Sequence, residues 1–202
     1  MANLKKHNFL EMQASSLKDP VIFVVDMIRG FIQEGALHDK RIENIVPSIE
    51  NLLHILKCPS IFVLDQHSTD AREFQSYPLH CVQGTSEAKI IDALRPYAKK
   101  CFVKNSTNTF MCPDFQSFLS TIDEYRDIVI TGCCTDLCIL QFALSLNAWL
   151  NEHDKKEHRV ILPIDCVETY DIPSVHDANF WNEFAIENMA CNGIMCVSQI
   201  TE

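Results

Sequence analysis

The sequence predicts an α/β protein in three layers, with a mostly parallel six-stranded sheet and helices on both of its faces. Two observations predict this fold class. Six apolar, β-branched runs are spread along the chain, and the segments between them carry apolar residues at helical spacing. Such alternation implies a parallel sheet with right-handed crossovers. A chain of 202 residues, 47% of them hydrophobic, can bury one substantial core, so we expect a single domain over residues 1–202.

The six predicted strands are short runs, most of which end in a polar or small residue. The first, PVIFVVD, is nearly continuous in apolar side chains, which is typical of a strand covered on both faces. The later runs are SIFVLD, KKCFVK, DIVITG, RVILPID and GIMCVS. We therefore predict strands over residues 20–26, 60–65, 99–104, 127–132, 159–165 and 193–198.

Helical spacing is clearest over residues 42–56, where apolar residues recur every three or four positions. The same periodicity predicts helices over residues 88–94, 113–122, 136–151 and 175–189. No linker, internal repeat or low-complexity segment interrupts this pattern. Residues 1–18 fit no element and are interpreted as a possible N-terminal extension, a position at which chains are commonly loosely ordered.

The net charge of −10 argues against two classes of partner. An acidic chain is repelled by a phosphate backbone and by an anionic bilayer, so we expect neither a nucleic-acid partner nor a membrane partner. The N-terminal residues lack the apolar core of a signal peptide, and no stretch of 18 apolar residues occurs. Most of the ten cysteines lie in apolar runs, so we expect reduced thiols in a cytoplasmic protein.

Chemically active side chains follow four of the predicted strands, at the edge of a parallel sheet where ligands usually bind. Asp26, Asp65 and Lys104 end the first three strands, and Gly132 ends the fourth, directly before two cysteines. We expect an acid, a second acid, a base and a cysteine-rich turn to face one crevice.

The turn TGCCTDLCIL places Cys138 in the first turn of a helix that Thr135 or Asp136 can cap. Free backbone N–H groups there would lower the pKa of the thiol and could hold an oxyanion. Asp26 could accept the thiol proton, while Lys104 could hold both anions in place. At this point two plainer interpretations stay open: Cys138 as one of ten buried cysteines, and Asp26 with Lys104 as an ordinary ion pair.

The segment DQHSTDAREFQSYPLH is interpreted as a metal site. Asp65 and His67 alternate on one face of an extended backbone, His80 follows a proline that stiffens its loop, and Glu73 lies between them. Two imidazoles and one or two carboxylates suit a divalent metal, with zinc preferred and iron or manganese as alternatives. The competing interpretation is a polar loop on the surface.

Four segments, in order, resemble the isochorismatase-like cysteine hydrolase superfamily and, within it, the nicotinamidase/pyrazinamidase group. The resemblance extends over nearly the whole chain, from about Val21 to Val197. The segments are VVDMIRGF, LDQH followed by YPLHCVQGTSEAKI, VKNSTNTF, and TGCCTDLCI. The second resembles the metal motifs DxH and PxHCxxGT, and the fourth resembles the nucleophile turn TGxxTDxC.

The resemblance implies a role for each of these residues. It implies a catalytic triad, a metal site, an oxyanion hole made by two N–H groups, a cis peptide between Cys133 and Cys134, and aromatic walls around the substrate. It also implies a small-molecule amide as the partner and, mildly, a homo-oligomer. The residues are Asp26, Lys104 and Cys138 for the triad; Asp65, His67, Glu73 and His80 for the metal; Cys134 and Cys138 for the oxyanion hole; and Phe31, Tyr77 and Cys133 for the substrate.

The function that the resemblance implies is metal-assisted hydrolysis of nicotinamide, or a similar aromatic amide, to the acid and ammonia through a thioester, as in NAD salvage. One alternative is an amidase of the same superfamily that acts on another small amide or an N-carbamoyl compound. Isochorismate hydrolysis is less favoured, because that branch does not need this nucleophile. A further alternative is a non-catalytic ligand- or metal-binding domain of the same fold.

Overall fold

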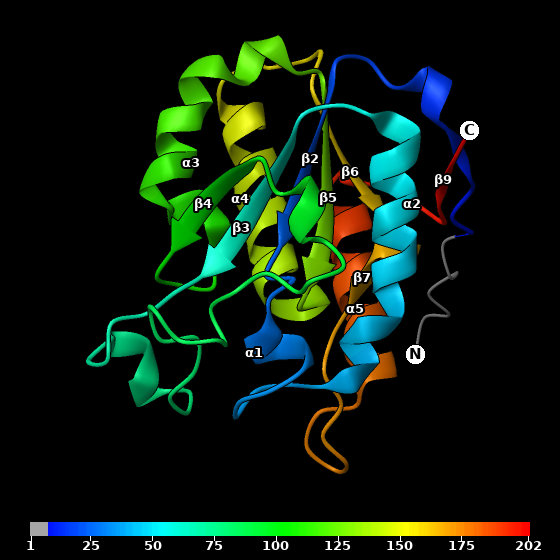
Figure 1. Cartoon of the computed structure of the whole chain (residues 1–202). Coiled ribbons are helices and arrows are strands. Elements are labelled where there is room, and N and C mark those ends of the chain that lie inside the picture. Colours follow the sequence, from blue (N-terminus) through cyan, green and yellow to red (C-terminus); the bar gives the residue numbers. More distant parts are fainter. Residues whose placement is uncertain (1–7) are drawn as a thin grey trace.

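The computed structural model describes residues 8–202 and contains the predicted parallel sheet (Figure 1). Residues 1–7, the first part of the expected N-terminal extension, lie outside the described residues. The sheet has the strand order β4-β3-β2-β5-β6-β8. A short strand, β7, pairs with the last residues of β5, past the point where the pairing of β5 with β6 ends. All six predicted strands are present and all pairs are parallel; β7 is the addition. The sheet strands are β2 Pro20–Val25, β3 Ser60–Asp65, β4 Lys100–Lys104, β5 Asp127–Cys133, β6 Arg159–Pro163, β7 Val167–Glu168 and β8 Met195–Val197.

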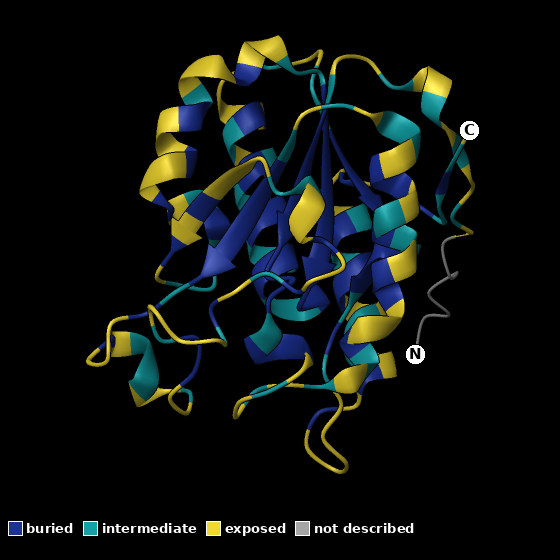
Figure 2. Cartoon of the chain, viewed as in Figure 1, coloured by how far each residue is buried: buried dark blue, intermediate teal, exposed yellow. Residues whose placement is uncertain are grey.

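Helices cover both faces of the sheet, whose central strands are buried (Figure 2). Alternate residues of β2 point to opposite faces. Phe23 packs in the cluster that includes residues of α3, α4 and α5, whereas Val24 packs in the cluster that includes residues of α1 and α2. Both residues are fully buried. The helices are α1 Arg29–Ile32, α2 Val46–Leu56, α3 Pro113–Phe118, α4 Leu140–Glu152 and α5 Ala178–Cys191. Shorter helical turns are η1 Ala14–Ser16, η2 Lys40–Ile45, η3 Arg72–Gln75, η4 Arg95–Tyr97, η5 Thr109–Met111, η6 Leu119–Glu124, η7 Thr135–Ile139 and η8 Ile164–Cys166.

The helix predicted over residues 88–94 is wrong. Its apolar positions Ala88, Ile91 and Leu94 are buried, as their spacing suggested, but the segment is built of turns. Part of its backbone bonds with the chain after β2: Ile91 N donates to Met27 O and Arg29 N donates to the carbonyl of residue 89, while Leu94 N closes a turn on Ile91 O. Tertiary pairing has overridden a helical pattern too short to hold by itself.

The described part of the N-terminal extension is tied to the opposite end of the chain. Strand β1, Met12–Gln13, pairs in parallel with β9, Ile200–Thr201, in a separate two-stranded sheet. None of the helices within residues 8–202 combines the length and the apolar character that a membrane crossing requires.

Candidate active site

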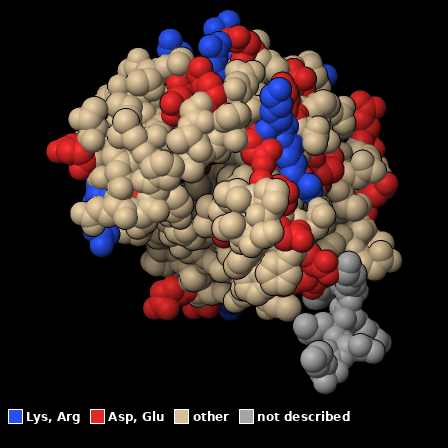
Figure 3. Space-filling view, turned by 90° about the horizontal axis from the view of Figure 1, so that it is seen from below, with Lys and Arg blue, Asp and Glu red and all other residues tan. Residues whose placement is uncertain are grey.

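The residues predicted from strand ends meet at the carboxyl edge of the sheet. Asp26 follows β2 directly, and Asp65 and Lys104 are paired in register at the ends of β3 and β4. On the other side of β2, strand β5 leads into the turn that carries Cys138. All four residues are buried. Seen from this edge, the molecule is hollowed near the middle of its face, and most of the residues around the hollow are uncharged (Figure 3).

The backbone at this edge is unusually tight where β2 and β5 pair. Gly132 has a φ of 111°, and a Cβ added there would lie 2.0 Å from Val25 O, so this register requires glycine. Asp26 has a φ of 55°, in the left-handed region that costs energy for a residue with a side chain. The peptide bond between Cys133 and Cys134 is cis, where the resemblance places it.

Lys104 connects the three other buried residues. Its Nζ lies 2.9 Å from Asp26 Oδ2, 2.8 Å from Asp65 Oδ1 and 3.7 Å from Cys138 Sγ. Burial lowers the pKa of Lys104, but Asp26 and Asp65 outweigh it and hold that pKa well above its usual value. The ammonium group therefore stays charged. Its positive charge offsets the negative charge of the two buried carboxylates, which would otherwise lack this counter-ion.

Asp26 has the properties of a base that is ready to accept a proton. Burial raises its pKa to about 6, against the lowering effect of Lys104. Lys104 Nζ lies 2.9 Å from Oδ2, and hydrogen bonds with Lys104 and Cys138 also lower the pKa of this carboxylate without cancelling the effect of burial. A carboxylate with a pKa close to neutrality is well matched to general base catalysis.

The predicted lowering of the pKa of Cys138 is wrong. Burial raises the pKa of this thiol well above its usual value, Lys104 opposes the rise, and Asp26 and Asp65 add to it. The position at the start of a helix does not outweigh this burial. The first turn is the π-helical η7, and neither Thr135 nor Asp136 caps it through a side chain. The resting group is a neutral thiol, so its proton must leave as it reacts.

Asp136 makes a contact that the sequence analysis missed. Its carboxylate accepts a hydrogen bond from Thr169 Oγ1 at 2.5 Å and lies 2.8 Å from His176 Nε2. These partners are 33 and 40 residues further along the chain, so no local signal marks them. The carboxylate ties the nucleophile turn to the loop after β7.

The four predicted metal ligands converge. Asp65, His67, Glu73 and His80 each offer a donor atom, and these atoms all lie within 4.8 Å of one another. Asp65 Oδ2 lies 2.8 Å from His67 Nε2 and 3.3 Å from His80 Nε2. Burial raises the pKa of Asp65, but Lys104 and the two imidazoles outweigh it and hold that pKa far below its usual range. The carboxylate is thus ionised, as a metal ligand must be.

Both imidazoles are oriented for a metal by their second nitrogen atoms. Nδ1 of His67 lies 2.7 Å from Asn105 Oδ1, and Nδ1 of His80 lies 2.7 Å from Pro78 O. An oxygen acceptor at Nδ1 fixes the proton there and directs Nε2 to the centre, which is the usual outer-shell arrangement of metal-binding histidines. The donor set therefore fits a divalent ion of the kind that imidazole and carboxylate bind together.

We expect His67→Ala to abolish stoichiometric metal binding. Removal of one imidazole from a four-donor set should lower the metal content of purified protein from about one ion per chain to below about one tenth. Loss of an outer-shell partner lowers metal affinity about 10- to 100-fold, and loss of a direct ligand should lower it at least as much. Mass spectrometry of the metal measures this content. The matched control is His153→Ala, which removes an exposed imidazole that bonds only to its own helix. Equal metal content in the two variants would rule out this site.

A small cavity of about 30 Å³, here called the reaction chamber, joins these groups. Cys138 and Cys134 line it together with Asp65, Glu73 and His80, and the other walls are Phe31, Leu37, Tyr77, Thr107 and Leu137. Of the three predicted substrate contacts, Phe31 and Tyr77 lie on its walls, each in ring contact with His80. Cys133 does not line it, because its fully buried thiol contacts Asp26 O at 3.3 Å.

Cys134 and Cys138, the two residues expected to form an oxyanion hole, both line the reaction chamber, and Cys134 begins the turn in which Cys138 lies. The carbonyl of Cys134 accepts hydrogen bonds from Leu137 N and Ile139 N within the helix that follows.

A buried thiol, an acid and an ammonium group meet beside a four-donor pocket at the carboxyl edge of a parallel sheet, an arrangement that fits a hydrolytic enzyme. A family model, the isochorismatase domain, matches residues 20–199. The chain belongs to the isochorismatase family.

Among curated proteins, the chain is 25% identical over 169 residues to nicotinamidase 1 of Arabidopsis thaliana, covering 74% of this chain and 66% of that protein. It is also 25% identical over 181 residues to a probable inactive nicotinamidase of the same plant, covering 82% and 88%. The chain thus spans just under two thirds of the first relative. The pyrazinamidase of Pyrococcus horikoshii in complex with zinc has the same fold, with 24% identity, a TM-score of 0.69 and coverage of 89% and 99%. The resemblance to the nicotinamidase group is confirmed.

Proposed function

We propose that this protein is a metal-assisted cysteine amidohydrolase that converts nicotinamide, or a similar aromatic amide, to the acid and ammonia. The observation that carries the proposal is the buried cluster in which Lys104 Nζ contacts Asp26, Asp65 and Cys138 at the wall of the reaction chamber. The nicotinamidase relatives support the choice of an aromatic amide.

The cluster accounts for each proton in such a reaction. Asp26 accepts the thiol proton while Cys138 Sγ attacks the carbonyl carbon, and the oxyanion is held by the N–H groups of Cys134 and Cys138. Asp26 then returns the proton to the departing nitrogen, which leaves as ammonia. A water molecule cleaves the thioester, again with Asp26 as base. Lys104 remains an ammonium group and offsets the negative charge at each stage.

The walls of the reaction chamber can orient the substrate. Phe31 and Tyr77 offer aromatic walls against which a flat ring gains stacking as well as burial. Asp65, His67, Glu73 and His80 would hold the divalent ion, which when bound supplies a Lewis acid that can polarise and orient a polar ring atom or a water molecule.

A ligand-binding domain without turnover is the second candidate, because one relative carries the name of a probable inactive nicotinamidase. Incubation of the purified, metal-loaded protein with nicotinamide decides between the two. The proposal expects ammonia and nicotinic acid in equal amounts. Binding of nicotinamide without release of ammonia would favour the second candidate. The same assay with an N-carbamoyl amino acid compares the other substrate class.

We expect kcat/KM for the amide to rise with pH through a pKa of about 6. Asp26 accepts a proton, so it must be ionised in the free enzyme, and burial sets its pKa at about 6. The rate should therefore be low below this pKa and approach a plateau above it. Rates measured over roughly pH 5 to 8 give the curve. A profile that instead rises only above about pH 8, at the titration of a free thiol, would assign no such role to Asp26.

A further inference from the structure

A second, larger cavity lies next to the reaction chamber. This outer chamber has a volume of about 290 Å³. The two chambers are adjacent, because they share five wall residues, namely Phe31, Leu37, Tyr77, Cys134 and Leu137. The remaining walls come from the loop after α1 and from the loop after β7, and are Ala36, His38, Asp39, Tyr170, Asp171 and Ile172.

The two volumes indicate which part of a substrate each chamber can hold. A cavity needs about 10–15 Å³ to admit one water molecule, so the 30 Å³ beside Cys138 accepts a group of only a few atoms, such as a carboxamide. The outer chamber, at about 290 Å³, approaches the size of pockets that bury a whole small ligand. The ring of an amide then lies at the junction, between the shared walls, and the outer chamber still has room beyond it.

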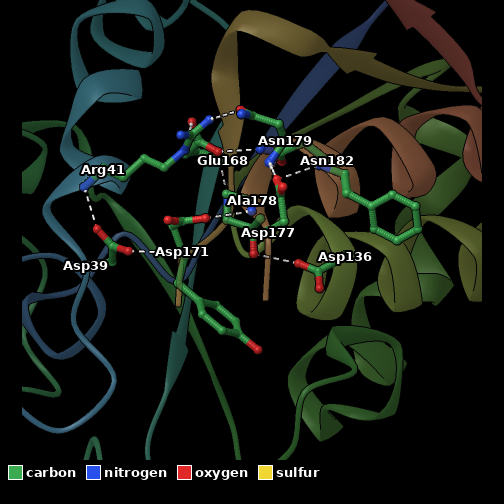
Figure 4. Close-up of polar contacts among 12 residues, drawn as sticks. Asp39, Arg41, Asp136, Glu168, Asp171, Asp177, Ala178, Asn179 and Asn182 are labelled. Atoms are coloured by element: carbon green, nitrogen blue, oxygen red, sulfur yellow. Dashed lines mark hydrogen bonds and ion pairs between the residues drawn. The ribbon is translucent and has the colours of Figure 1, made fainter. Parts of the chain in front are cut away.

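The charged residues that line the outer chamber determine which chemical group can bind there. Within residues 8–202, no lysine or arginine lines it, and its two carboxylates already accept hydrogen bonds from backbone N–H groups. Asp39 accepts hydrogen bonds from the N–H groups of Arg41 and Asp171, and Asp171 accepts one from Ala178 (Figure 4). Their negative charge disfavours an anionic group, and because both already accept hydrogen bonds from backbone N–H groups, neither lacks a partner that a cation would supply. The other walls are mainly apolar or aromatic. The occupant that fits best is therefore uncharged and apolar.

The wall of the outer chamber is fixed to the nucleophile turn. The rings of Tyr170 and His176 are stacked 3.9 Å apart, and His176 lies 2.8 Å from the carboxylate of Asp136, two residues before Cys138. The loop that holds Ile172 is closed by a bridge between Ile172 and His176. The outer chamber is therefore a preformed extension of the site, which lowers the entropic cost of ordering a bound substituent.

We propose that the substrate is a primary aromatic amide that carries an uncharged, apolar substituent, with the carboxamide in the reaction chamber and the substituent in the outer chamber. The proposal rests on the amidohydrolase function proposed above. Hydrolysis consumes one water and gives ammonia together with the substituted aromatic acid.

Three kinds of substrate test the proposal: nicotinamide, nicotinamides with an n-butyl group at ring carbon 5 or ring carbon 6, and the same compounds with a 3-carboxypropyl group. Ammonia release gives kcat/KM for each. We expect at least one butyl compound to exceed nicotinamide by about tenfold or more, since a single methylene in an apolar pocket is worth roughly 10- to 200-fold. We expect its carboxylated counterpart to lose that gain.

Two tryptophan variants in the loop after β7 test whether the preference for the butyl compound arises in the outer chamber. Ile172→Trp narrows the outer chamber and should lower the ratio of butyl compound to nicotinamide by about fivefold or more, within the range that one apolar contact contributes. The matched control is Val175→Trp, at a residue that is 77% exposed and lines neither chamber, which should leave the ratio unchanged. Melting temperatures show that both variants fold.

The outcomes separate the two proposals. Nicotinamide cleaved as fast as both butyl compounds would overturn the substituent proposal and leave the amidohydrolase in place. No ammonia from any compound would overturn both. Cleavage of a butyl compound with little cleavage of nicotinamide would support both. An equal response of the ratio to the two tryptophan variants would also overturn the outer chamber as the binding site.

Discussion

Cys138→Ala should abolish amide hydrolysis, with kcat/KM reduced by at least about 10⁴-fold, the scale seen when a nucleophile is removed from an enzyme that forms a covalent intermediate. No neighbouring group can replace it. Cys134 also lines the reaction chamber, but only Cys138 has its sulfur in contact with Lys104. Ammonia release measures the loss. The structural cost should be small, because alanine removes a single sulfur from a wall of an existing cavity.

Cys166→Ala is the matched control for this variant. Cys166 is also buried, and burial raises the pKa of its thiol well above the usual value, so it shares the environment of Cys138 without the neighbours. We expect its activity to stay within about twofold of the parent, as for a change away from the reacting groups. A Cys138→Ala protein that still forms ammonia at a comparable rate would remove the thioester from the mechanism.

Lys104→Met should both destabilise the protein and inactivate it. Methionine leaves Asp26 and Asp65 buried without their shared counter-ion, and loss of one partner from a buried ion pair costs about 3–5 kcal/mol. For a protein of this size that corresponds to a melting temperature lower by roughly 6–20 °C. Since Lys104 lowers the pKa of Asp26, its removal also raises that pKa further, and more of the base is protonated at neutral pH.

Lys100→Met on the same strand separates this effect from a general loss of charge. Its ammonium group is exposed and lies 5.2 Å from the ring centre of Phe102, a contact worth about 0.5–1 kcal/mol at the surface. We expect a change of only a few degrees and full activity. Differential scanning calorimetry gives the melting temperatures. Equal melting temperatures for the two variants would show that Lys104 does not neutralise the buried carboxylates.

The sequence predicted the sheet and the grouping of the site well, because both depend on strong and repeated signals. Six apolar runs identify six strands, and parallel strands must bring Asp26, Asp65 and Lys104 to one edge. Where prediction was wrong, long-range contacts decided. Backbone pairing with residues 27–29 replaced the predicted helix over residues 88–94.

The pKa of Cys138 could not be predicted from the sequence for the same reason, because it depends on contacts made only in the folded protein. Position in a helix indicates a lowered pKa, but the size of the burial that opposes it depends on the surrounding fold. The capping role predicted for Asp136 was wrong for a related reason, since its partners Thr169 and His176 reach it only in the folded chain. Cys133 was expected at the substrate and instead faces the backbone of Asp26.

The order of the strands in the sheet also has a consequence for biosynthesis. The first strand of the main sheet, β2, lies at its centre; the chain then builds one flank outward from β2 to β4, and only then returns to the centre with β5. Every charged partner and every metal donor is therefore translated before Cys138, whose sequence number is higher than all of theirs. A domain generally folds as a unit, so these side chains come together only after β5 and the turn that follows it have been translated. The sulfur of the proposed nucleophile is thus the last of them to be made.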